Sequence, residues 1–115
     1  IDLMLVSTAR RAQETAHQLS QVELKSSHRS DQANLYHCSV LELLDLILHE
    51  AKDAKSILVI GHEPSLSQTI HRLTRTSIDL KTADCALLSC NAEDWSSLYR
   101  GPSWQLRQIV SAPRS

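Results

Sequence analysis

Two short stretches place ionisable side chains directly after apolar runs. In VSTARRAQETA, Arg10 and Arg11 stand at the start of a helical pattern, and in VIGHEPSLSQ, His62 follows the aliphatic run of residues 57–60. A cation in the first turn of a helix opposes the helix dipole, unless an anion lies between them. Arginine, histidine and two helix N-termini are the usual components of a phosphate site.

The two stretches can form one site only if the apolar runs are neighbouring parallel strands. In open α/β sheets, ligands bind beyond the carboxyl ends of the strands. Arg10 or Arg11 would then come near His62, and Gly61 would permit a close backbone approach to the ligand. The plainer alternative is a solvated arginine and a turn histidine, and these residues alone leave both interpretations open.

The elements that must position these residues alternate between strands and helices. Strands are predicted at residues 1–6, 57–60, 83–90 and 104–111, and helices at about 9–19, 40–54 and 65–75. Capping-box spacing supports two helix starts, at Ser39 with Glu42 and at Ser65 with Gln68. Residues 21–34 are predicted to be a mobile loop, and residues 91–99 a turn or short helix with Asn91 as a possible cap. The order predicts an α/β fold with a mostly parallel sheet, whose last two strands either pair antiparallel or join the sheet edge.

Composition limits the class of protein. The chain has 115 residues, which predicts one domain spanning 1–115, and a net charge of −1, which argues against a nucleic-acid binder. No apolar run approaches the length of a membrane span, so no membrane partner is expected. Cys38, Cys85 and Cys90 fit neither a disulfide framework nor a zinc site, and we expect mostly buried thiols in a cytoplasmic protein. No metal or cofactor is predicted.

The two stretches also resemble known motifs. STARRAQETA, residues 7–16, resembles the S-x-x-x-R-A-x-x-T-A motif of the histidine phosphatase superfamily, and VIGHEPSL, residues 59–66, resembles its V-x-G-H-x-P-x-L motif. The spacing and the ending ALLSCNAEDWSSL most resemble small phosphohistidine phosphatases of the SixA type. The resemblance implies a three-layer α/β/α fold like that of phosphoglycerate mutase.

The resemblance also implies roles for individual residues. Arg11 would bind phosphoryl oxygens, and His62 would hold the phosphoryl group and stabilise its charge. Arg10 occupies a variable position and is expected to be exposed. Ser7 is expected to be structural and to cap the following helix. Glu63 should point away from His62, and no carboxylate in the sequence stands out as a general acid.

One family feature is missing from the sequence. Members begin with a strand that ends in R-H-G, whose histidine is the nucleophile, and no R-H-G occurs in these 115 residues. We therefore expect an N-terminally truncated domain that lacks the first strand and helix and is inactive alone. The complete protein would remove phosphate from phosphohistidine on a protein, or from a small phosphate ester, through a covalent phosphohistidine. The alternative is an inactive module that binds a phosphorylated partner.

Overall fold

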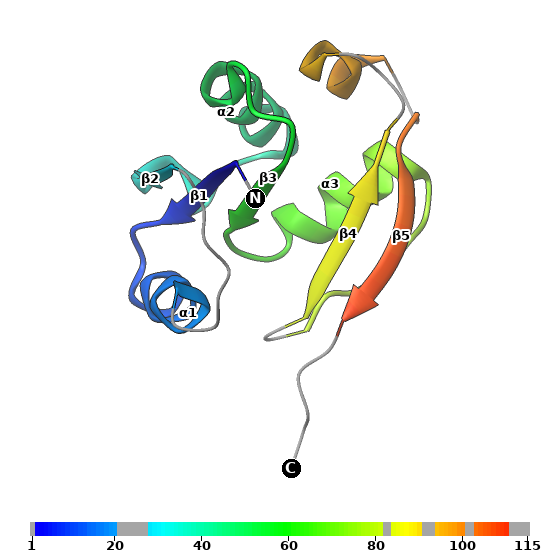
Figure 1. Cartoon of the computed structure of the whole chain (residues 1–115). Coiled ribbons are helices and arrows are strands. Elements are labelled where there is room, and N and C mark those ends of the chain that lie inside the picture. Colours follow the sequence, from blue (N-terminus) through cyan, green and yellow to red (C-terminus); the bar gives the residue numbers. More distant parts are fainter. Residues whose placement is uncertain (1, 21–27, 82–83, 91–93, 101–102, 111–115) are drawn as a thin grey trace. The chain divides into compact units, whose positions relative to one another are not determined.

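The computed structural model of the chain describes residues 2–20, 28–81, 84–90, 94–100 and 103–110. The chain divides into two compact units, Ile1–His62 and Glu63–Ser115. The first contains β1 (Leu3–Ser7), α1 (Arg10–Ser20), β2 (Arg29–Gln32), the 3₁₀ helix η1 (Ala33–Leu35), α2 (Val40–Ala51) and β3 (Ile57–Ile60) (Figure 1). The second contains α3 (Ser65–Thr74), β4 (Cys85–Ser89), the 3₁₀ helix η2 (Trp95–Tyr99) and β5 (Gln105–Val110). That the two units form a single domain stays a prediction.

The first unit is built on a parallel sheet with the strand order β2-β1-β3. Every residue of the central strand β1 is buried. Met4 and Val6 form a cluster with Ala12 and Ala16 of α1, and these small alanines let the helix lie close to the sheet. Figure 1 shows α2 on the opposite side of this sheet from α1. The predicted α/β class and parallel pairing are confirmed.

Strand β2 corrects the prediction of a loop over residues 21–34. Residues 29–32 pair with β1 in parallel register, with Ser7 opposite Gln32. The sequence RSDQ is polar and its side chains alternate between exposed and half-buried, so it carries no hydrophobic strand signal. Backbone pairing at the sheet edge, rather than apolar burial, holds it in place. Residues 21–27 lie outside the described residues.

Helix α2 begins with the predicted capping box. The Ser39 hydroxyl accepts from the Glu42 backbone N–H at 3.1 Å, and the Ser39 backbone N–H donates to the Glu42 carboxylate at 3.2 Å. The helix ends at Ala51 rather than at the predicted residue 54. Lys52 has a positive φ of 46°, which stops the helical repeat.

The capping box predicted for α3 is wrong. The helix begins one residue earlier than that box requires, with Pro64 at the N-cap and Ser65 buried as its first residue. Glu63 instead caps the first turn of α3. Its carboxylate accepts from the Ser67 backbone N–H at 2.9 Å and from the Ser67 hydroxyl at 2.5 Å. This contact engages the Glu63 side chain within the second unit.

The last two strands form an antiparallel hairpin, which decides between the two predicted arrangements. β4 pairs only with β5 among the described strands, with a register shift between Leu87 and Leu88. The predicted turn or short helix before β5 is the 3₁₀ helix η2, and Asp94 caps it by accepting from the Ser96 backbone N–H at 2.9 Å. Asn91, the predicted cap, lies outside the described residues.

No disulfide joins the three cysteines, all of which lie in the described part of the chain. Cys38 is buried as expected, but Cys85 is exposed and Cys90 is half-buried, so the prediction of mostly buried thiols is wrong for Cys85. Cys85 is the first residue of β4, in which exposed and half-buried residues alternate from Cys85 to Leu88. None of the described helices has both the length and the apolar composition needed to cross a membrane.

Strand β3 has the sequence of a central strand but pairs, within the described strands, with β1 alone. Its four residues, ILVI, are all aliphatic, and each is only half-buried. Continuous apolar runs are typical of parallel strands that are covered on both faces. Unpaired backbone groups on an apolar edge strand favour pairing with another chain.

We expect the 115-residue chain, expressed by itself, to be marginally stable and to self-associate through the β3 edge. Val59→Lys should reduce this association more than the matched change Ile109→Lys in β5, because only the first places a charge on β3. Light scattering after size-exclusion chromatography, at several protein concentrations, measures the effect. Cooperative unfolding of a monomer at high temperature would contradict the prediction.

Candidate active site

The carboxyl ends of β1 and β3 bring Ser7 and His62 together. Val6 of β1 lies opposite Ile60 of β3 in the parallel register, so the residues that follow both strands emerge at the same edge of the sheet. There the Ser7 hydroxyl oxygen lies 2.7 Å from Nε2 of His62. Ser7 belongs to the first motif and His62 to the second, so this hydrogen bond joins the two motifs.

The protonation of His62 decides the direction of this hydrogen bond. Ser7 has no exposed surface, and its hydroxyl oxygen accepts from the Ala9 backbone N–H at 3.2 Å. This bond ends at Ala9, before α1 begins at Arg10, so it stabilises the turn that leads into the helix and is not the predicted helix cap. When neutral His62 carries its proton on Nδ1, the Ser7 hydroxyl donates to Nε2 and Nδ1–H is left to donate to a ligand. When the proton is on Nε2, the second lone pair of the Ser7 hydroxyl accepts it.

Two aromatic neighbours flank His62. The Tyr36 and His62 ring centroids are 5.0 Å apart at an interplanar angle of 81°, and Tyr36 makes a similar edge contact with His37 at 4.1 Å. His37 has a φ of 63°, in the left-handed region that non-glycine residues enter at some cost. Burial lowers the pKa of His62 below its usual 6.5, and the charge of His37 lowers that pKa further.

A second polar cluster fixes the start of α1 against the sheet. The Gln13 amide donates to the Ser7 carbonyl oxygen at 2.9 Å and to the Asp31 carboxylate at 3.3 Å. Arg29 donates to the Gln13 amide oxygen at 2.7 Å and forms an ion pair with Asp31 at 3.0 Å. Hydrogen bonds from Arg29 and Gln13 lower the pKa of Asp31. The cluster therefore ties β2 and α1 to the end of β1.

The two candidate arginines differ in their contacts. The Arg10 side chain is 92% exposed and forms an ion pair with Glu14 one helical turn away, at 3.0 Å, as expected for a variable position. Arg11 is also exposed in the first turn of α1. Its side chain makes no hydrogen bond or ion pair with any residue that the structure describes, so its approach to His62 stays a prediction.

Three carboxylates that could act as general acids, those of Glu42, Asp45 and Glu63, are engaged elsewhere or exposed. Glu42 completes the capping box of α2, and Glu63 is bound to Ser67, as described above. Asp45 is exposed on α2. Within the described ranges, no group of three or more histidine, cysteine or acidic side chains is arranged to hold a metal ion.

Three solved structures resemble this chain over 96% of its length. SixA from Nakamurella multipartitia matches with a TM-score of 0.75 and 23% sequence identity. A protein histidine phosphatase SixA complexed with tungstate matches with a TM-score of 0.76 and 21% identity. SixA from Agrobacterium tumefaciens matches with a TM-score of 0.71 and 20% identity. The chain covers 70%, 69% and 68% of them, respectively. The chain has the SixA fold. No protein-family model and no curated protein sequence matches it.

This result confirms the fold implied by the motif resemblance. At 20–23% identity the likeness concerns the fold alone. The sequence did not indicate that Tyr36 or His37 would lie near His62, because both follow residues 21–34, which show no strand or helix pattern. It also did not indicate that the buried Ser7 hydroxyl contacts His62, since a capping role already accounted for that serine. The contact of Ser7 with His62, 55 residues away in the sequence, becomes visible only in the folded structure.

We predict that His62 titrates below pH 6.5 and that His37→Ala raises its pKa by removing a positive neighbour. Because the unfolded chain takes up a proton at this histidine more readily, the free energy of unfolding should fall as the pH drops from above 6.5 through the His62 pKa. NMR titration of the His62 ring measures the pKa directly. His49→Ala, at an exposed position of α2 in the same unit, is the control and should leave the His62 pKa unchanged. An equal shift in both variants would contradict the prediction.

Proposed function

We propose that the protein containing these residues is a phosphatase that removes phosphate from phosphohistidine on a protein. The observation that carries the proposal is the 2.7 Å contact between Ser7 and His62, which joins the two motif stretches at one sheet edge. The fold shared with three SixA structures supports it. One of those proteins is complexed with tungstate, a tetrahedral oxyanion like phosphate, which agrees with an oxyanion site in this fold.

His62 is proposed to hold the phosphoryl group. In the tautomer proposed here Nε2 accepts from Ser7, so that Nδ1–H is the donor to a phosphoryl oxygen while the ring is neutral. Binding of a phosphate dianion favours the protonated ring and so raises the His62 pKa, against the effects of burial and His37. The Ser7 hydroxyl can rotate to accept from a protonated Nε2, so the same contact serves both protonation states.

Arg11 is proposed as the second phosphoryl ligand. Its guanidinium forms no ion pair or hydrogen bond with a described residue. Binding an oxyanion therefore breaks no such contact. A planar guanidinium donates two parallel hydrogen bonds to phosphoryl oxygens, and its charge stabilises the group during transfer. Phosphoryl transfer depends mainly on such positioning and charge stabilisation. Arg10 is paired with Glu14 and lacks this freedom.

The proposed reaction needs a nucleophile that the 115 residues do not supply in an R-H-G motif. A histidine nitrogen would attack phosphorus, the P–N bond of the substrate would break, and its imidazole would leave with a proton. Water would then hydrolyse the enzyme phosphohistidine and regenerate the histidine. Because imidazole is a good leaving group, a phosphohistidine substrate needs little help from a general acid, in keeping with the engagement of Glu63, the residue after His62, by Ser67. These 115 residues by themselves should be inactive.

A second candidate is a module that binds a phosphorylated partner without turnover, and a complete reading frame without an R-H-G would favour it. Both candidates use Arg11 and His62 in the same way and differ only in the nucleophile. Phosphate-dependent shifts of the His62 resonances, with no phosphate release by the complete reading frame, would select the binding module. Absence of any phosphate-dependent shift would contradict both.

The decisive experiment uses the complete reading frame that carries these residues. We expect Arg11→Ala and His62→Ala each to lower the rate of phosphate release from a phosphohistidine protein on the order of 100-fold, as for loss of one donor to a developing charge. Arg10→Ala is the matched control, one residue away on the same exposed turn, and should keep the wild-type rate. Rates near wild type in both the Arg11 and His62 variants would overturn the assignment.

A further inference from the structure

Helix α1 contacts the sheet through two small residues. Ala12 and Ala16 are buried against β1, and partly buried residues of β3 pack against the same cluster. Because an α-helix turns through about 100° per residue, the two neighbours of Ala12 leave the helix on opposite flanks of this contact. These neighbours are Gln13 and Arg11, so whatever fixes Gln13 also sets the direction in which Arg11 leaves the helix.

The flank that carries Gln13 faces β2. The Gln13 amide nitrogen donates to the Asp31 carboxylate at 3.3 Å, and its amide oxygen accepts from Arg29 at 2.7 Å. The same nitrogen donates to the carbonyl oxygen of Ser7 at 2.9 Å. Arg29 and Asp31 are themselves joined by an ion pair at 3.0 Å, which holds the anchor on β2 together. These contacts set the rotation of α1 about its own axis.

The flank that carries Arg11 faces the other neighbour of β1. The sheet order is β2-β1-β3, so the side of α1 away from β2 is the side of β3. Helix α1 begins at Arg10, directly after the turn that follows β1, so its first turn lies at the carboxyl edge of the sheet. His62 follows β3 at the same edge. Arg11 therefore leaves the first turn on the flank toward His62.

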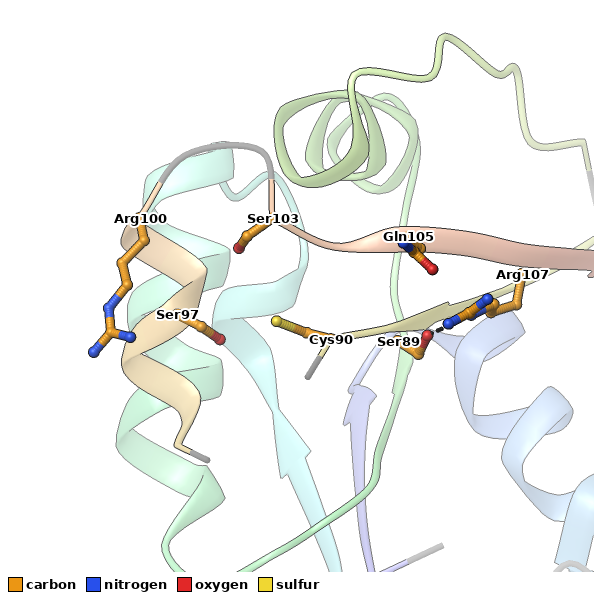
Figure 2. A pocket seen from close by; sticks show the side chains of 7 residues that line it. All are labelled: Ser89, Cys90, Ser97, Arg100, Ser103, Gln105 and Arg107. Atoms are coloured by element: carbon orange, nitrogen blue, oxygen red, sulfur yellow. Dashed lines mark hydrogen bonds between the residues drawn. The ribbon is translucent and has the colours of Figure 1, made fainter. Parts of the chain in front are cut away.

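Arg11 has no described partner that could hold this direction. Figure 2 shows the contrasting arrangement in the second unit, where Arg107 donates from Nε to the Ser89 hydroxyl at 2.6 Å and is oriented by that contact. The Arg11 side chain makes no hydrogen bond or ion pair with any residue that the structure describes, and it is exposed. The rotation of α1 thus decides on which side of the helix the guanidinium is offered.

We propose that Gln13 is a positioning residue, which through its contacts with β2 and Ser7 directs Arg11 toward the phosphoryl group at His62. This inference rests on the proposed function, which gives Arg11 its role as a phosphoryl ligand. A helix held in one rotation before the ligand arrives reduces the ordering cost of binding and keeps the donor in a productive geometry. Gln13 is bound to the fold in this arrangement, so its effect on the reaction should pass through Arg11.

A double-mutant cycle in the complete reading frame tests this role. Gln13→Leu removes the amide contacts at similar side-chain size, and it should lower the kcat of phosphate release from a phosphohistidine protein on the order of tenfold. In the Arg11→Ala background the same change should lower kcat less than about twofold, because the group that Gln13 directs is absent. Glu14→Gln, the exposed next residue of α1, is the matched control and should keep the wild-type rate. Equal losses in both backgrounds, or no loss in either, would overturn the proposal.

Arg29→Gln provides the test if Gln13→Leu prevents folding. This change removes the contact with the Gln13 amide oxygen and leaves the bond from Gln13 to the Ser7 carbonyl in place. We expect a smaller loss of kcat, which again disappears in the Arg11→Ala background. A loss of the same size in that background would show that the cluster serves the fold only, and would refute positioning of Arg11.

The same cycle can be measured by affinity if the protein binds phosphate without turnover. The Kd of inorganic phosphate, read from shifts of the His62 ring resonances, should rise on the order of tenfold in Gln13→Leu only when Arg11 is present. A wild-type protein that neither binds nor releases phosphate would overturn the proposed function and this inference together. A wild-type protein that does either, and that Gln13→Leu leaves unchanged, would overturn the role of Gln13 alone.

Discussion

Parallel pairing of β1 with β3 is the constraint on which the candidate active site depends. Because both strands run in the same direction, their carboxyl ends lie at one edge, and the register of Val6 with Ile60 sets Ser7 beside His62. An antiparallel pair would send the residues after the two strands to opposite edges. The buried β1 holds this register rigidly, since a slip by one residue would turn its apolar side chains to the wrong faces.

Apolar runs and motif residues predicted most of this arrangement. The strands predicted at residues 1–6 and 57–60 follow from apolar runs, and the first is observed at Leu3–Ser7. The helix with Ala12 and Ala16 on its buried face follows from hydrophobic periodicity. The α2 capping box follows from two residues at the right spacing. These features are local, so a short stretch of sequence contains all the information that determines them. The fold, in turn, agrees with that of the SixA structures.

The features that the sequence did not reveal depend on distant partners. The RSDQ segment becomes β2 because β1 offers it a backbone edge, and no property of those four side chains signals this. Glu63 displaces the expected Ser65 capping box because the helix begins at a different residue, a choice that local spacing leaves undecided. Tyr36 becomes a neighbour of His62 only after η1 has placed it there. Long-range geometry thus decides which polar residues join the site.

The protonation of His62 connects this geometry with function. Partial burial and the neighbouring His37 lower the pKa of His62, and this favours the neutral ring in the empty site. The phosphoryl group proposed to bind here would stabilise the proton that the empty site disfavours. The electrostatics that lower the His62 pKa in the empty site thus make protonation of His62 depend on the bound anion.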